Sequence, residues 1–201
     1  MLLKDLSNNL RVRIGRMSDE LQNKLDDELV KTAVFKKLDM DKKLKKMEYL
    51  LRLGANVNGW DVEGKTALQQ VCFYNNIEMA KKLLEMGARV DEKDKNCVTP
   101  LMVACRGGNV EMVKLLIDNG AEVNKKNLIG ATALEYAIRA KSYEIVDVLI
   151  KAGANVNVKN SFGENLSQLA ERLNLGKIAL RLKNEEKNKM FMDILENERR
   201  R

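Results

Sequence analysis

The side chains of this chain that could do chemistry are three cysteines and several pairs of adjacent carboxylates, and histidine is absent. Without histidine, no Ser-His, Cys-His or histidine–metal arrangement can form, and hydrolases and many metalloenzymes rely on these arrangements. The cysteines Cys72, Cys97 and Cys105 are odd in number and match neither a zinc-ligand spacing nor a disulfide framework. We therefore expect no enzymatic activity, no metal, no cofactor and a reducing compartment.

The remaining polar motifs have simpler explanations than catalysis. The pairs Asp26-Asp27, Asp91-Glu92 and Glu185-Glu186 fall in segments expected to be exposed turns or helix faces, where water solvates carboxylates. Gly107-Gly108 lacks the strand and the lysine that a phosphate-binding loop requires. Neither motif predicts an acid–base pair or a nucleotide site.

Composition indicates which elements must position these side chains. Of the 201 residues, 45% are apolar and 32% are charged, so the chain is expected to fold without any membrane span. One proline and 4% aromatic residues favour helices over strands. Charge follows Met1-Leu2-Leu3 too soon for a secretory signal, which predicts a cytoplasmic protein and leaves a secreted effector open.

A 33-residue period organises the middle of the chain. Gly-Ala recurs at residues 54, 87, 120 and 153, and each pair is followed two residues later by valine. Downstream, the same spacing aligns three segments: Asp61-x-x-Gly64-x-Thr66-Ala67-Leu68, Asp94-x-x-Cys97-x-Thr99-Pro100-Leu101 and Asn127-x-x-Gly130-x-Thr132-Ala133-Leu134. Such a register indicates a repeat architecture, in which each unit buries its apolar face against its neighbours.

The pattern resembles the ankyrin repeat, whose unit is a β-turn followed by two antiparallel helices. The signature histidine is replaced at Gln69, Met102, Glu135 and Gln168, and only Pro100 keeps the signature proline. The resemblance implies an all-α solenoid of about five stacked helix-turn-helix units, with short β-turn hairpins and helical caps. We predict repeats at residues 28–60, 61–93, 94–126, 127–159 and 160–183.

The residues support the same elements independently of the family. Thr66, Thr99, Thr132 and Asn165 can cap the first helix of a unit, and Asn76, Asn109 and Ser142 can cap the second. Glycines 87, 120 and 153 can close the second helix in a left-handed conformation. Apolar residues should stack in columns, namely Leu68, Leu101, Leu134; Ala80, Val113, Val146, Ala179; and Leu50, Leu83, Leu116, Leu149, Leu182.

The flanks are predicted to cover the two ends of the array. Residues 1–27 form a helical cap or arm, with a short helix at 18–29 that Ser18 begins and a weaker apolar stripe of Leu2, Leu3, Leu6 and Leu10. Residues 184–201 form a C-terminal helix and a disordered basic tail, with Met190, Phe191, Ile194 and Leu195 facing inward. Polar substitutions at Lys36, Lys37, Ser167 and Lys183 mark the solvent sides of the end repeats.

Two other features leave alternative functions open. Residues 31–60 carry eight Lys or Arg against three acids, so the Lys-rich segment 36–46 could bind nucleic acid or another acidic surface, although no aromatic residues interleave it. A solvated capping face explains this segment as well. Cys97 replaces a tip glycine near Lys93 and Lys95, so a reactive thiol is a third hypothesis. We favour instead a tolerated substitution of the glycine, without a function for the thiol.

The resemblance implies that the chain binds another protein and acts as a scaffold or an inhibitor. Ankyrin arrays bind through a concave side made of the hairpin tips and the exposed faces of the inner helices, and such a preformed surface loses little entropy on binding. We expect the chain alone to be monomeric and nucleic acid to be the less favoured ligand. Transferred position by position, the predicted binding residues are Trp60, Val62, Phe73, Tyr74, Arg106, Leu128, Ile129, Arg139 and Phe162.

Overall fold

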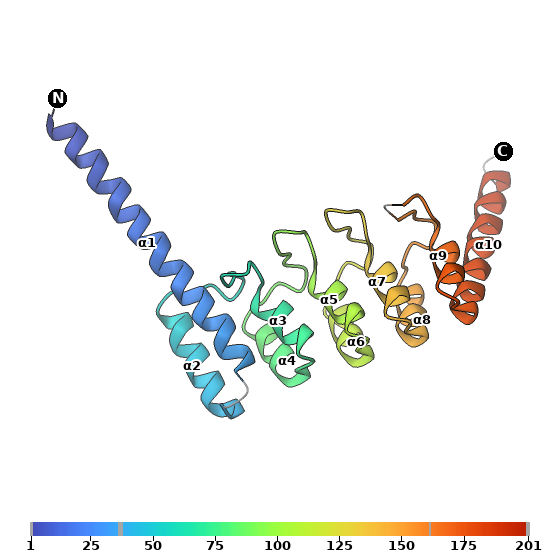
Figure 1. The fold of residues 1–201 in the computed structure, drawn as a ribbon, viewed down its shortest axis with the longest axis horizontal. Coiled ribbons are helices and arrows are strands. Elements are labelled where there is room, and N and C mark those ends of the chain that lie inside the picture. Colours follow the sequence, from blue (N-terminus) through green and yellow to red (C-terminus); the bar gives the residue numbers. More distant parts are fainter. Residues whose placement is uncertain (1, 36–37, 161, 200–201) are drawn as a thin grey trace. The chain divides into compact units, whose positions relative to one another are not determined.

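The computed structural model describes residues 2–35, 38–160 and 162–199, and for residues 2–17 it describes the backbone alone. Within these ranges the chain forms ten α-helices and three isolated β-bridges (Figure 1). The helices belong to two compact units, residues 1–95 and 96–201. The predicted all-α class, built from sequential helix pairs, is confirmed.

The first unit contains four helices, which are α1 (Leu2–Val34), α2 (Met40–Arg52), α3 (Ala67–Phe73) and α4 (Ile77–Glu85). Helix α1 packs against both α2 and α3, and α3 packs against α4. The core between them is apolar and buried, and its largest members are Leu29, Met47, Leu68, Met79 and Leu83. Because each helix presents one apolar face, packing against a neighbour is what stabilises it.

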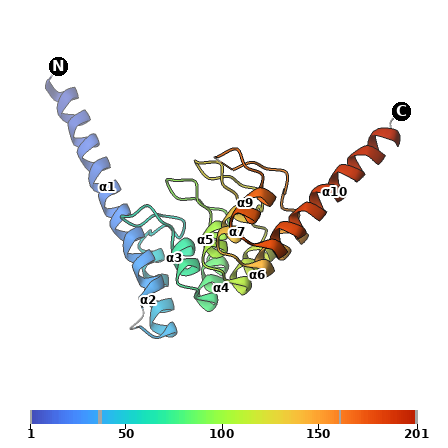
Figure 2. The same cartoon turned by 45° about the vertical axis from the view of Figure 1, so that its right-hand side comes forward.

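The second unit contains three helix pairs, which are α5 (Pro100–Arg106) with α6 (Val110–Asp118), α7 (Ala133–Arg139) with α8 (Tyr143–Lys151), and α9 (Leu166–Arg172) with α10 (Gly176–Arg199). The first helices stack in the order α5, α7, α9, and the second helices in the order α6, α8, α10 (Figure 1); Figure 2 shows α5, α7 and α9 after a turn of 45°. The predicted columns are buried in both units: Leu68, Leu101, Leu134; Ala80, Val113, Val146, Ala179; and Leu50, Leu83, Leu116, Leu149, Leu182.

Most predicted helix caps are present. The Thr66 hydroxyl accepts a hydrogen bond from the Gln69 N–H at 3.2 Å, and the Gln69 side chain accepts one from the Thr66 N–H at 2.9 Å. Asn76, Asn109 and Ser142 cap the second helices of their pairs in the predicted way. Thr132 makes no such cap, because its buried hydroxyl has no hydrogen-bond partner among the described residues. Each cap satisfies an N–H that the helix leaves unpaired.

The connecting hairpins use left-handed residues at their tips. Gly64, Gly130 and Gly163 all have φ of +78°, and Cys97 occupies the matching position with φ of +57°. Two of the three β-bridges, Lys126 with Thr132 and Lys159 with Asn165, close hairpins of the second unit. Cys97 is therefore a non-glycine residue in a conformation that favours glycine, as its place in the register predicts.

The N-terminal flank differs from its prediction. The short helix expected at 18–29 is part of one continuous α1, so Ser18 lies inside a helix and does not begin one. No proline interrupts these residues, and a single Gly15 costs only about 1 kcal/mol in a helix. The predicted boundary between residues 27 and 28 falls within this helix, and the repeat boundaries themselves stay a prediction.

The first repeat also departs from the 33-residue register. The register places its inner helix near residues 34–40, whereas α1 ends at Val34 and α2 already begins at Met40. Asp39 caps α2 by accepting a hydrogen bond from the Lys42 N–H at 2.9 Å. The last turns of α1 therefore take the place of the inner helix, and Lys36 and Lys37 lie outside the described residues.

The C-terminal flank also differs from its prediction. Helix α10 runs without a break from Gly176 to Arg199, so the predicted boundary at 183/184 falls inside it and Arg199 is helical. Only its first turns are buried, through Ile178, Ala179 and Leu182. Three of the four side chains expected to close the array, Met190, Phe191 and Ile194, are instead exposed, and Leu195 is half-buried.

Two polar residues predicted to face water are buried. Ser167 is 4% exposed, so it is a small core residue of α9 and does not mark a solvent face. Asp26 is 7% exposed and accepts hydrogen bonds from the Asn56 N–H at 2.7 Å and the Gln22 amide at 2.8 Å. A Cβ at Gly59 would lie 2.7 Å from the Asp26 Cβ, so only glycine fits there. Asp26 thus joins α1 to the loop after α2.

Cys97 provides a test of the hairpin geometry. The left-handed conformation costs a residue other than glycine about 1–2 kcal/mol. Replacement by glycine removes this cost but lowers stability by about 0.5–1 kcal/mol, because glycine has more conformational entropy in the unfolded chain. We expect Cys97→Gly to raise the free energy of unfolding by up to about 1 kcal/mol, as measured by urea denaturation. Gly130→Ala, at the matching position, should lower it; a destabilised Cys97→Gly variant would contradict the assignment.

Candidate protein-binding surface

Side-chain hydrogen bonds hold the hairpin tips in place. The side-chain oxygen Oδ1 of Asn127 accepts hydrogen bonds from the backbone N–H groups of Ile129 at 3.1 Å and Ala131 at 2.9 Å. In the next repeat, Asn160 accepts in the same way from Phe162 at 2.9 Å and from Glu164 at 3.0 Å. These bonds fix each tip before any partner arrives, so its outward side chains have defined positions.

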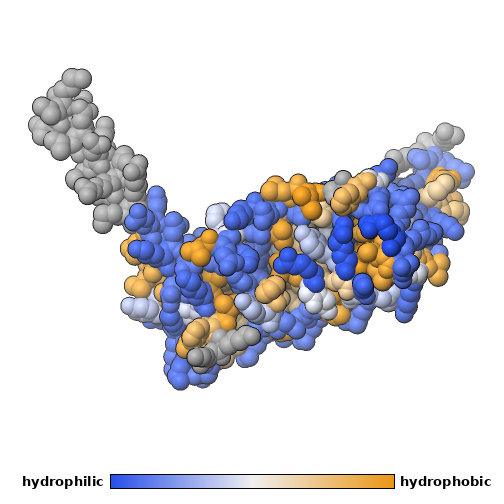
Figure 3. All heavy atoms as spheres, viewed as in Figure 1, coloured by the Kyte–Doolittle hydropathy of each residue, from blue (hydrophilic) through white to orange (hydrophobic). Residues whose placement is uncertain are grey.

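All nine residues predicted to bind a partner are exposed. In the first unit these are Trp60, Val62, Phe73 and Tyr74, and in the second unit they are Arg106, Leu128, Ile129, Arg139 and Phe162. The most exposed are Val62 at 83% and Phe162 at 76%. Figure 3 shows hydrophobic atoms along the edge that the hairpin tips of the second unit form. Exposed apolar groups in such numbers are typical of contact surfaces.

The aromatic residues of the first unit lie in two places. The Phe73 and Tyr74 rings at the end of α3 meet edge to face, with centroids 5.2 Å apart and planes at 82°. Trp60 instead lines a hollow of about 760 Å³ on the hairpin side, together with Asn58, Arg89 and Lys95. The structure therefore brings Phe73 and Tyr74 together and places Trp60 in a separate hollow, so these three predicted binding residues do not form one cluster.

Sequence reasoning missed a contribution from α1 to this region. Tyr74 lines a pocket of about 670 Å³ with Val34, Phe35 and Leu38, and Phe35 is 50% exposed. The repeat register assigned Phe35 to an inner helix, so its exposure was not expected.

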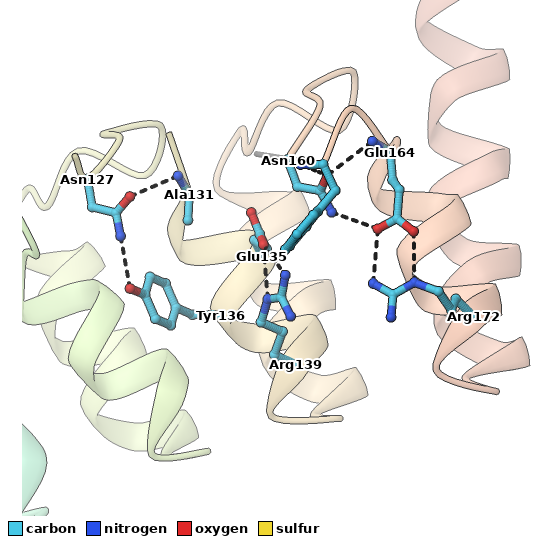
Figure 4. Close-up of polar contacts among 9 residues, drawn as sticks. Asn127, Ala131, Glu135, Tyr136, Arg139, Asn160, Glu164 and Arg172 are labelled. Carbon is cyan, nitrogen blue, oxygen red and sulfur yellow. Dashed lines mark hydrogen bonds and ion pairs between the residues drawn. The ribbon is translucent and has the colours of Figure 1, made fainter. Parts of the chain in front are cut away.

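A polar network lies beneath the tips of the second unit (Figure 4). The Asn127 amide donates to the Tyr136 hydroxyl at 2.9 Å, and the Asn160 amide donates to Glu164 at 2.9 Å. Glu164 also accepts two hydrogen bonds from Arg172, at 2.7 and 3.0 Å. The Arg172 and Asn160 hydrogen bonds lower the pKa of Glu164 to about 2. The network ties the hairpin before α9 to the end of that helix.

The arginines that end the inner helices differ in their partners. Arg139 donates to the buried Glu135 carboxylate at 2.9 and 2.7 Å, and its charge helps to lower the pKa of Glu164. Arg172 is held by Glu164. Arg106 occupies the matching position on α5 and has no ion pair among the described residues.

The Lys-rich segment is less available than its sequence suggested. Lys42 pairs with Asp39 at 2.9 Å, Lys46 pairs with Glu28, and Lys43 is buried. The Asp39 carboxylate raises the pKa of Lys42 through a hydrogen bond and its charge. Of the lysines described in segment 36–46, Lys45 alone is exposed without an ion pair.

The described residues contain no group of side chains that could hold a metal ion. Cys72 and Cys105 are buried, and burial raises the pKa of the Cys72 thiol, which makes it unreactive. Cys97, the candidate reactive thiol, is half-buried. In the part of the chain that the structure describes, no helix is long and apolar enough to cross a bilayer.

Two family models match the chain. One, for ankyrin repeats in three copies, matches residues 88–160, and another, for ankyrin repeats in many copies, matches residues 33–84. The chain therefore belongs to the ankyrin repeat family, as the register predicted. Such repeats are typically protein–protein interaction modules and are generally non-catalytic. A search of curated proteins finds none that matches.

The Glu164 network predicts a pH-dependent stability. A carboxylate whose pKa is lowered by folding stabilises the native state above its ordinary pKa of 4.5, and this contribution is lost as the pH falls towards about 2. Wild type should therefore exceed Glu164→Gln in unfolding free energy at neutral pH, and the difference should shrink across that window.

Urea unfolding of both proteins at a series of pH values measures this difference. Glu198→Gln, at an exposed position near the end of α10, is the matched control and should track wild type throughout. A gap between wild type and Glu164→Gln that keeps its size from neutral to acid pH would contradict the ionic role of Glu164.

Proposed function

We propose that this chain binds a partner protein through its hairpin tips and inner-helix ends, as a non-enzymatic scaffold or inhibitor. The observation that carries the proposal is the exposure of large apolar side chains on hairpins whose backbones are already fixed by Asn127 and Asn160. A hairpin whose backbone is already fixed loses little conformational freedom on binding, so burial of its side chains against a partner contributes most of its free energy to affinity.

The exposed apolar side chains at the hairpin tips favour this surface as the one that binds the partner. Leu128, Ile129 and Phe162 are each more than 60% exposed, and no folding role accounts for their exposure. Burial of apolar area gives about 25 cal/mol per Å², so three such side chains could anchor an interface. In the first unit, Phe73 and Tyr74 beside the pocket of Phe35 and Leu38 could serve the same role.

Binding of nucleic acid or another acidic surface through residues 36–46 is the second candidate. The ion pairs of Lys42 and Lys46 and the burial of Lys43 leave this segment with little free charge among its described residues. A ligand held there would dissociate steeply with rising salt and would be insensitive to changes at the tips.

Affinity capture from the native cell tests the proposed function. The baits are wild type, the variant Leu128→Ser/Ile129→Ser/Phe162→Ser, the variant Trp60→Ala/Phe73→Ala/Tyr74→Ala, and Tyr49→Ala as a matched control. Tyr49 is 61% exposed on α2, away from the predicted positions. Because the changed side chains are exposed, the melting temperatures should stay close to that of wild type.

We expect at least one protein to be retained by wild type and Tyr49→Ala and lost from one of the surface variants. The variant that loses it identifies the unit that binds. Identical capture by all four baits would contradict the assigned surface.

A further inference from the structure

The binding face of the second unit carries an excess of positive charge. We define this face as residues 96–106, 126–139 and 159–172, which are the hairpins and inner helices. Among its described residues the carboxylates are Glu135, Glu164 and Glu171, and each already pairs with a basic side chain: Arg139, Arg172 and Lys183, respectively. The face therefore has no carboxylate left to neutralise a further cation.

The remaining cations of this face are Arg106, Lys126 and Lys159. All three are exposed, and none has an ion pair among the described residues. Lys126 and Lys159 lie at matching positions where their hairpins begin, and the β-bridges to Thr132 and Asn165 fix their backbones. Charges held on a rigid backbone at repeated intervals form a patterned surface, which favours a ligand of complementary charge.

Arg106 differs from Arg139 and Arg172, its counterparts in the next two repeats, because no carboxylate of the repeat is placed to bind it. Four residues before Arg139 lies Glu135, and eight residues before Arg172 lies Glu164, and these carboxylates bind the two guanidinium groups. The corresponding residues for Arg106 are Met102 and Val98. An arginine that ends a helix with its five donors unengaged is suited to bind a carboxylate from outside.

We propose that the second unit binds an acidic protein segment in which apolar residues alternate with Asp or Glu, and that Arg106 is its main anchor. This inference rests on the proposed function and names the chemistry of the partner. Arg106, Lys126 and Lys159 pair with its carboxylates, and Leu128, Ile129 and Phe162 contact its apolar side chains. A nucleic acid would satisfy the charges but would leave the aliphatic tips without partners.

The test uses random peptides displayed on phage and selected against the full chain, followed by dissociation constants for the peptides obtained. We expect the selected peptides to be rich in Asp and Glu among apolar residues. Arg106→Gln should weaken their binding about tenfold, since a charged hydrogen bond at an interface is lost. Lys114→Gln, which removes an exposed charge on α6, is the matched control and should leave the affinity unchanged.

A second variant keeps Arg106 but gives its guanidinium group an ion-pair partner within the chain. Val98→Glu places a carboxylate at the position from which Glu164 binds Arg172, so it should weaken peptide binding about as much as Arg106→Gln. Agreement between the two variants would show that a free guanidinium, and not the shape of its side chain, binds the peptide.

The outcomes separate this inference from the proposed function. Peptides that are not acidic, or that ignore Arg106→Gln and Val98→Glu yet are lost from Leu128→Ser/Ile129→Ser/Phe162→Ser, would overturn the inference and leave the function standing. Peptides insensitive to every one of these variants, or no selected peptide, would overturn the inference, and the affinity capture described above would then decide the proposed function. Single-stranded DNA that displaces the peptides and depends on Arg106 alone would also overturn the inference, in favour of nucleic acid.

Discussion

The structure depends on the inability of any single helix pair to bury its own apolar face. Leu116, Leu149 and Leu182 come from successive pairs of the second unit, and each is fully buried because its neighbours cover it. Burying a side chain of this size contributes about 1.5–3 kcal/mol, so a unit is stable only as a stack. The stacking direction is thereby fixed, and the hairpin tips are left outside the core.

This division explains how one chain can hold a fixed fold and a variable surface. Tip residues such as Leu128 and Phe162 are largely exposed, whereas Asn127 and Asn160 near them hold the turn. Changes at the former leave the stack intact, and changes at the latter alter the hairpin itself. Binding specificity can therefore reside in a few exposed side chains on a backbone that is already ordered.

The repeat register predicts the middle of the chain well, because a strict period repeats the same caps and the same buried columns. It fails at both ends, where Ser18 and Met190 have no neighbouring repeat to define their surroundings, and where α1 and α10 continue past the predicted boundaries. The exposure of Arg106 follows from the repeat register, whereas the pairing of Arg139 with Glu135 and of Arg172 with Glu164, with which unpaired Arg106 contrasts, is seen only in the structure.

Hydrogen–deuterium exchange of the full chain, free and with a bound partner or selected peptide, tests the central claim most directly. The account predicts that exchange slows at the hairpins before α7 and α9 and at the ends of the inner helices, while α6 and α8 are unaffected. Protection confined to α6, α8 or the exposed end of α10 would contradict it.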